Sequence, residues 1–282
     1  MSLGAADITL VVPCFNGEPY LARTLEGCTR QTVPPHELLV VDDGSTDGSA
    51  TVARSFPVRV LTHRRNRGIA AARNTALAAI RTPLVAFVDA DAVPDPALIE
   101  GFLRAFADDG VVGVGGRGRE DQRSTLADRW RCTFWQQTHG DEPLADAWMV
   151  MGLCCAFRVA AVRDIGGFDP RYTRAGEDVD VSLRLRATGG RLVYRPELVV
   201  RHVRRDGWRS LARMVALHSS GQVHAVHRNG LSTRPHHLSA VRWWVVSTGS
   251  SLRRHRSPSL AAMSVVMGAV SIGAKASARW GG

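Results

Sequence analysis

The chain has almost no lysine and no cysteine pattern that indicates a metal cluster or a disulfide framework. Among its 282 residues, Lys275 is the only lysine. The five cysteines are odd in number and lack C-x-x-C spacing, which predicts buried thiols in a reduced, cytoplasmic protein. The first seven residues have neither a basic start nor an apolar stretch, so we expect no signal peptide.

Acidic residues are nearly missing from the C-terminal third. Between Arg201 and Arg256 the only acid is Asp206, and the whole chain carries a formal net charge of +10. Such a region predicts contact with an anionic surface or substrate. Its tryptophans are not interleaved with arginines as a base-stacking platform requires, so we expect no nucleic-acid partner.

The first half of the chain alternates strand and helix patterns joined by short connections. We expect strands at 8–12, 37–41, 58–61 and 84–88, and helices at about 19–29, 48–54, 69–80 and 96–107. This rhythm predicts an α/β protein with a parallel, doubly wound sheet. Later elements are expected as two strands around 148–157, a helix at 179–187, short strands at 192–194 and 198–200, and basic helices after 201.

Three acidic clusters interrupt this pattern. Asp42-Asp43 and Asp89-Ala90-Asp91 each follow an apolar run that reads as a buried strand, and Glu177-Asp178 opens a helix. In an open α/β sheet, ligands bind outside the carboxyl ends of the strands. The clusters therefore predict one cleft for a charged, phosphorylated substrate.

The D-x-D triplet at Asp89 and Asp91 has the chemistry of a metal site. Mg²⁺ and Mn²⁺ accept one or two protein carboxylates and take their remaining ligands from water and substrate phosphates. One carboxylate would take the metal, and its neighbour the ribose or a metal-bound water. The alternative is a solvated turn, although Asp95 already supplies a capping acid nearby.

Two further segments suit a nucleotide. Asp47 or Ser45 can cap the helix that follows them, which leaves Asp42 and Asp43 without a structural task. A carboxylate there can accept a hydrogen bond from a uracil imide or a ribose hydroxyl. The stretch 66–74 opens a helix with a glycine for close approach and with cations suited to a diphosphate.

Taken together, these motifs resemble family 2 glycosyltransferases in order and spacing over roughly residues 7–203. The matching segments are 11–16, 41–47, 66–74, 87–91, 166–169 and 177–180, together with Pro196 and His202. The resemblance implies a GT-A fold (Rossmann-like, a mostly parallel sheet flanked by helices), a nucleoside-diphosphate sugar donor with UDP favoured, and hexosyl transfer with inversion at the anomeric carbon.

The resemblance also implies roles for residues on the donor side. By position, Pro13, Phe15 and Asn16 would line the nucleotide, and Asp43 would read the base. The diphosphate site would be bordered by two residues of the 66–74 stretch, Gly68 and Arg73.

At the reacting end, Asp91 matches the more direct ligand of Mn²⁺ or Mg²⁺, with Asp89 beside it in the metal motif. His202 matches a histidine near the metal and diphosphate. Asp178, preceded by Glu177, matches the general base that takes a proton from a hydroxyl acceptor carried by a glycan, a lipid or a small molecule. Gly152 matches the acceptor-side loop, with one departure: Met151 stands where Thr is common.

The chain is expected to divide near residue 205. Residues 1–205 would form the catalytic domain, with a nucleotide-sugar half to about 115 and an acceptor half from 116, followed by a basic helical region at 206–282. Trp243-Trp244 beside arginine favours peripheral docking at the inner face of the cell membrane over a helical cap or a dimer contact. The apolar run at 259–274 is shorter than the ~20 residues of a membrane span.

Two other functions remain in view. A nucleotidyltransferase would be expected to carry a glycine-rich, lysine-bearing loop for triphosphate, and residues 13–18 are not such a loop. A noncatalytic nucleotide-sugar-binding protein or membrane-docked scaffold would keep the fold without turnover. The presence of Asp91 and Asp178 argues against that function.

Overall fold

The computed structural model describes residues 3–278, and the chain divides into two compact units. The first unit comprises the residues up to 119 together with 137–173 and 177–204. The second comprises 120–136, 174–176 and the residues from 205 onward. Segment 120–136 therefore belongs to the same unit as the C-terminal helices, whereas the sequence predicted it to be part of the acceptor half.

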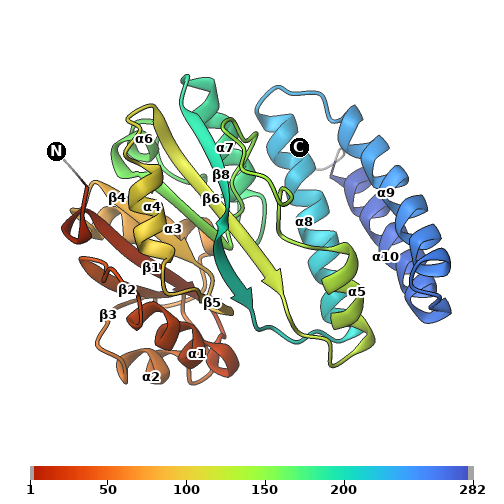
Figure 1. Ribbon diagram of the computed structural model, residues 1–282, viewed down its shortest axis with the longest axis horizontal. Helices are drawn as coiled ribbons and strands as arrows, with labels where there is room; N and C mark the ends of the chain where they lie inside the picture. Colours follow the sequence, from red (N-terminus) through yellow and green to blue (C-terminus); the bar gives the residue numbers. More distant parts are fainter. Residues whose placement is uncertain (1–2, 279–282) are drawn as a thin grey trace. The chain divides into compact units, whose positions relative to one another are not determined.

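The first unit is built on one mixed sheet with strand order β3-β2-β1-β4-β7-β6-β8-β5 (Figure 1). The strands are β1 (Ile8–Cys14), β2 (Glu37–Asp42), β3 (Arg59–Thr62), β4 (Leu84–Val88), β5 (Ala92–Pro94), β6 (Val111–Glu120), β7 (Cys154–Arg158) and β8 (Arg191–His202). The helices are α1 (Glu18–Thr29), α2 (Ser49–Arg54), α3 (Ile69–Ala79), α4 (Leu98–Ala105), α6 (Val159–Asp164) and α7 (Glu177–Ala187), after a short 3₁₀ turn at Ala5–Asp7.

The parallel part of the sheet positions the predicted donor residues. Strand β1 pairs in parallel with β2 on one side and with β4 on the other, and β2 pairs in parallel with β3. The chain therefore moves outward from β1 to β3 and returns to β4 on the opposite side. In open α/β sheets such a reversal is where ligands bind, so we expect a ligand site outside the carboxyl ends of β1 and β4. The predicted α/β fold is confirmed. The sheet is mixed, because β4 pairs with β7, and β7 with β6, in antiparallel direction.

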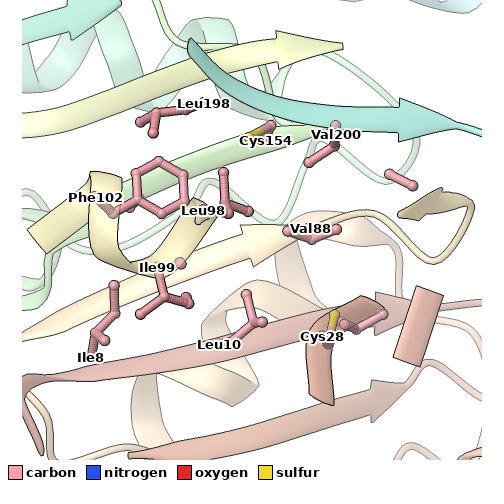
Figure 2. Close-up of a cluster of buried hydrophobic side chains, with 14 of the residues drawn as sticks. Ile8, Leu10, Cys28, Val88, Leu98, Ile99, Phe102, Cys154, Leu198 and Val200 are labelled. Atoms are coloured by element: carbon pink, nitrogen blue, oxygen red, sulfur yellow. The ribbon is translucent and has the colours of Figure 1, made fainter. Parts of the chain in front are cut away.

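The core explains why these strands read as continuous apolar runs. Every residue of β1 and β4 is buried, as expected for strands covered on both faces. Figure 2 shows Ile8 and Leu10 of β1 gathered with Leu98 and Phe102 of α4 in one cluster. A Cβ on Gly101 would collide with Leu198, so α4 packs closely on β8. All five cysteines are buried free thiols, as the sequence predicts, while the reduced, cytoplasmic environment stays a prediction.

Three strand predictions were wrong. The strand expected near 148 is absent. The strand that pairs with β7 on the side away from β4 is instead β6. Strand β6 was not predicted, because glycines at four positions (113, 115, 116 and 118) interrupt its apolar periodicity. They are needed there, because a Cβ on Gly116 would collide with the backbone oxygen of Leu198. The two short strands expected at 192–194 and 198–200 form one strand, β8, that continues through Pro196.

The second unit is helical, as expected for the basic region. It contains α5 (Leu126–Phe134), α8 (Trp208–Arg228), α9 (Arg234–Arg253) and α10 (Pro258–Ser277). Helix α10 packs along α8, α9 and α5 (Figure 1). Trp130 of α5 is fully buried against Trp243, and the buried Arg131 pairs with Glu120 and Asp206. Helix α5 is therefore part of this core, which the sequence analysis did not predict.

Helix α10 is longer than the apolar run that indicated it. It has 20 residues and a mean hydropathy of 1.5 in its most apolar window, so by length and composition it is able to cross a membrane. The expectation that this segment is too short was wrong, because the helix continues through Lys275 to Ser277. A buried core helix passes the same test, and 39% of that window is buried.

Candidate active site

The loop after β1 is held by the loop after β2. Pro13 is buried inside β1 opposite Val41, whereas the sequence had placed it in the loop. The Asn16 N–H donates to Ser45 Oγ at 2.9 Å, and Asn16 Oδ1 accepts from the Thr46 N–H at 2.8 Å. Phe15 is 48% exposed beside this clamp. Of the three residues predicted to line the nucleotide, Phe15 and Asn16 are exposed, whereas Pro13 is buried.

Asp43 has a structural role, although none was predicted for it from the sequence. Its buried carboxylate accepts from the backbone N–H groups of Arg67 (2.9 Å) and Gly68 (2.7 Å). It also contacts His63 Nδ1 at 2.6 Å, and His63 Nε2 contacts Thr75 Oγ1 at 2.8 Å. Asp43 and His63 therefore fix the loop that precedes α3 to the end of β2. The role of Asp43 in reading the base stays a prediction.

A glycine is required at position 68 by close contact with another segment of the same chain. It has a φ of +91°, and a Cβ there would collide with the Thr173 backbone. The Ile69 N–H donates to the Thr173 carbonyl at 3.1 Å. The close approach that the sequence assigned to a diphosphate is made by residue 173, and contact with the diphosphate stays a prediction.

Arg73 is the buried centre of the site. Its side chain is 1% exposed and lies between the Phe87 and Phe168 rings, with Cζ 5.2 and 5.4 Å from their centroids. Its guanidinium lies 3.1 Å from Glu177 Oε1 and 3.5 Å from Asp89 Oδ1. The sequence analysis expected a cation that faces the diphosphate. The structure instead places this cation beneath the carboxylates, where it offsets their charge.

The D-x-D residues point to different partners. Asp89 contacts Arg73, whereas Asp91 Oδ2 lies 3.3 Å from His202 Nε2. Burial opposes ionisation of Asp91, but the charge and hydrogen bond of His202 lower its pKa to about 2. Strand β5 pairs with the end of β8, and the Val203 N–H donates to the Asp91 carbonyl at 2.9 Å. Two of the three predicted metal ligands are thus adjacent.

The full predicted ligand set is not assembled in one place. Across residues 3–278, no group of three or more histidine, cysteine, aspartate or glutamate side chains is positioned to hold a metal ion. Asp91 and His202 nevertheless supply an ionised carboxylate and an imidazole side by side. Both groups fit a divalent cation that takes its other ligands from phosphate and water.

Asp178 and Glu177, at the start of α7, differ in how deeply their side chains are buried. The Glu177 side chain is 7% exposed, whereas Asp178 is only partly buried. Asp178 Oδ1 accepts from the Val179 N–H at 2.8 Å, and its Oδ2 accepts from the Gly152 N–H at 3.0 Å. The Gly152 carbonyl in turn accepts from Arg73 at 3.0 Å. Gly152 therefore links the buried cation to the accessible carboxylate through its backbone.

The two carboxyl groups have different environments. Burial and the Asp178 carboxylate raise the pKa of Glu177 to about 8, against the opposing charge of Arg73. A buried carboxyl group whose pKa is raised in this way is typical of a catalytic site. Of the two, Asp178 is the more exposed, and its role as general base stays a prediction.

Two residues that contribute to this site, His63 and Phe168, were not predicted from the sequence. His63 stands alone in a basic stretch, so no local pattern pointed to it. Phe168 was noted only within the Gly166–Asp169 motif. Its N–H and carbonyl are both bonded by the Asn74 side chain, at 2.8 and 2.7 Å, which fixes its ring beside Arg73. The available sequence signal for this contact was that Asn74 and Phe168 both lie in motifs of the family resemblance, 66–74 and 166–169.

Comparison with known proteins identifies the family. The model of glycosyl transferase family 2 matches residues 9–166. The chain belongs to this family. It is 31% identical over 260 residues to the pre-mycofactocin glycosyltransferase of Mycobacterium tuberculosis, a match that covers 88% of this chain and 54% of that protein. It therefore spans about half the length of this relative.

Other family members align over similar lengths. Glycosyltransferase AglE of Haloferax volcanii is 25% identical over 248 residues, covering 85% of this chain and 80% of that protein. Among solved structures, the mannosyltransferase PcManGT from Pyrobaculum calidifontis, in complex with GDP-Man and Mn²⁺, superposes with a TM-score of 0.68. That match has 20% identity and covers 97% of this chain and 87% of the other. It confirms the GT-A fold of this family 2 chain.

Proposed function

We propose that this chain transfers a sugar from a UDP-sugar to a hydroxyl acceptor with inversion at the anomeric carbon, using Asp178 as general base. The observation that carries the proposal is the accessible, doubly hydrogen-bonded Asp178 carboxylate above the buried Arg73–Glu177 pair. Family membership supports nucleotide-sugar chemistry. TarS of S. aureus, solved with UDP-GlcNAc, shares the fold at a TM-score of 0.57.

The residues of the site can carry out a direct displacement. Asp178 accepts the acceptor proton as the hydroxyl oxygen bonds to the anomeric carbon. The bond from that carbon to the diphosphate breaks, and its electrons leave on the nucleotide. Gly152 and Val179 hold the carboxylate in place during this step, which lowers the cost of orientation. No covalent intermediate on the enzyme is needed.

Asp91 and His202 would hold Mn²⁺ or Mg²⁺ in this proposal, with Asp89 beside them. The ionised Asp91 and the adjacent imidazole are suited to that role. When bound, the metal would offset the charge that develops on the departing diphosphate. PcManGT was solved with Mn²⁺, which supports the choice of ion.

Ligand-dependent thermal stabilisation tests the donor and the metal together. UDP-, GDP- and dTDP-sugars are added with and without Mn²⁺, because a ligand that binds the folded state raises apparent stability by mass action. We expect the largest shift with a UDP-sugar plus Mn²⁺. A larger shift with GDP-sugars would overturn the nucleotide assignment and agree with the ligand of PcManGT.

Turnover is tested separately. The Mn²⁺-dependent release of UDP from the stabilising donor is measured, and the anomeric configuration of the product is read by NMR. We expect inversion. Metal-dependent donor binding without any release would instead favour a noncatalytic nucleotide-sugar-binding protein of the same fold.

A further inference from the structure

The outward face of α10 has no charged side chain. Between residues 260 and 276 its exposed positions recur at three- and four-residue spacing and are apolar or small, namely Ala262, Val265, Val266, Ala269, Gly273 and Ala276. Val265 and Val266 are 43% and 48% exposed. A helix face in contact with water normally carries polar or charged residues. This face is therefore suited to an apolar environment.

Helix α9, which packs along α10, presents a second apolar surface. Its large exposed side chains are Leu238, Val241, Val245, Val246 and Leu252, with exposed fractions between 45% and 71%. Arg242 and Arg253 are exposed on the same helix. We call the exposed residues of α9 and α10 together the α9–α10 surface.

The charge around this surface has one sign. After Asp206 the sequence contains nine arginines and Lys275 but no aspartate or glutamate. Arg254 and Arg256, in the connection between the two helices, are also exposed. Helices α9 and α10 and their connection therefore carry exposed arginines and no aspartate or glutamate. An apolar surface with such charges is complementary to anionic headgroups above a hydrocarbon layer.

The inner side of α10 is fixed to its own unit. Trp130 Nε1 donates to Ser264 Oγ at 2.9 Å, and the hydroxyls of Ser219 and Ser271 lie 2.8 Å apart in the core. Lys275 is also buried. To cross a bilayer, α10 would have to break these contacts and expose a lysine to lipid. Only the outward face is available, so docking at the interface is favoured over spanning.

A second copy of the chain is a poorer occupant of this surface. Two copies that pair through it would bring the same arginines together, with no carboxylate after Asp206 to offset them. Like charges that face each other across an interface reduce affinity. An anionic partner has the opposite effect.

We propose that the α9–α10 surface docks peripherally on a bilayer that contains anionic lipid. The valines and leucines enter the headgroup–acyl boundary, and Arg242 and Arg253 contact the phosphates. The binding is reversible and weakened by salt, because charge contributes only within a Debye length of the surface. This property goes beyond sugar transfer and is tested without any sugar donor, so the two proposals fail independently.

Vesicle co-sedimentation is the direct test. The whole chain is mixed with vesicles of phosphatidylcholine alone, or of phosphatidylcholine and phosphatidylglycerol at about seven to three, at about 50 and about 500 mM salt. We expect sedimentation with the anionic vesicles at low salt and a large loss at high salt. Absence of sedimentation with anionic vesicles, or equal binding to both compositions, overturns the proposal.

Matched variants assign the binding to this surface. Arg242→Gln with Arg253→Gln should weaken partitioning by about thirtyfold at low salt. Arg59→Gln with Arg104→Gln removes the same charge from exposed positions in the first unit and should have a much smaller effect. An equal loss in both pairs would show attraction by net charge alone and would overturn the assignment.

The apolar part has its own variant. Val245→Glu with Val266→Glu changes two exposed positions, so the fold should be retained, as circular dichroism can check. We expect this variant to lose vesicle binding. Sedimentation equilibrium without lipid completes the test, because a dimer that these glutamates dissociate, with no binding of the parent to vesicles, would identify the surface as a self-association interface.

Discussion

The backbone N–H of Gly152 donates to the Asp178 carboxylate at 3.0 Å. The carbonyl of Gly152 accepts from Arg73, so one peptide segment connects the fully buried guanidinium to the accessible carboxylate. Both contacts use main-chain atoms. The link therefore does not depend on the side chain of Met151, the position at which the chain departs from the resemblance. The geometry of the proposed base is set by the backbone of an acceptor-side loop.

Replacing Asp178 with asparagine should separate binding from turnover. The amide oxygen can still accept a backbone N–H but cannot take a proton, so we expect a loss in kcat of about a hundredfold or more. Donor affinity should change little, as measured by Mn²⁺-dependent thermal stabilisation. Asp141→Asn, at an exposed position, is the control and should retain activity. Near wild-type transfer in Asp178→Asn would assign the base elsewhere.

Asp91→Ala and His202→Ala should share one phenotype. Each removes one member of an adjacent pair, so each is expected to weaken the Mn²⁺-dependent binding of UDP. Residues in direct contact couple, so the double variant should lose less than the two single losses combined. UDP titrations across Mn²⁺ concentrations measure this coupling. If His202→Ala keeps the Mn²⁺ dependence of the parent chain, the histidine does not contact the metal.

Glu177 predicts a pH dependence of stability. Its pKa is raised from 4.5 to about 8 in the folded chain, so between these values the folded state holds a proton that the unfolded state has released. The free energy of unfolding should therefore fall as pH rises through this window, by up to about 1.4 kcal/mol per pH unit.

Glu177→Gln removes the group that titrates, so the slope over this window should flatten. Urea unfolding at several pH values between about 5 and 8 compares the two chains. Identical slopes in the parent and in the variant would show that Glu177 is already ionised at low pH in the folded state.

Gly68→Ala should destabilise the chain more than a positive φ alone explains. Gly189 has a similar φ, +84° against +91°, but a Cβ there has no atom within 4 Å. Gly189→Ala should therefore cost only about 1–2 kcal/mol of backbone strain. Gly68→Ala adds a collision with Thr173 and should cost clearly more in urea unfolding. Equal costs would mean that the 173 segment moves aside freely.

The parallel part of the fold was predictable because it depends on short-range patterns. The expected strand at 84–88 has the bounds of β4 as observed, and the helix at 69–80 differs from α3 by one residue. Both are uniform apolar or alanine-rich segments with clear breaks. Strand β6 was not predictable in this way, because its glycines fit atoms contributed by other segments of the chain, such as the Leu198 backbone oxygen that faces Gly116.

The positions of the acidic clusters at strand ends were also predicted, but their partners were not. Asp43 was interpreted as available for a nucleotide, yet its carboxylate is occupied by the 67–68 backbone and by His63. Arg73 was interpreted as a diphosphate contact, yet it is buried between two aromatic rings. A residue type at a given spacing indicates chemistry, whereas the direction of a side chain depends on loops that pack from elsewhere in the sequence.

The pairing of β5 with β8 has a consequence for how the chain is made. Asp91 leaves the ribosome early, but strand β5, which begins directly after it, has no strand partner until the segment that ends at His202 has emerged. Chains fold from the N-terminus during synthesis, so the parallel strands can assemble while the metal-binding end is still open. A nascent chain stalled before β8 is therefore expected to contain a formed sheet centre and no affinity for Mn²⁺-nucleotide. Under the proposed function, the capacity to bind the donor would arrive late in translation, once β8 has emerged to pair with β5.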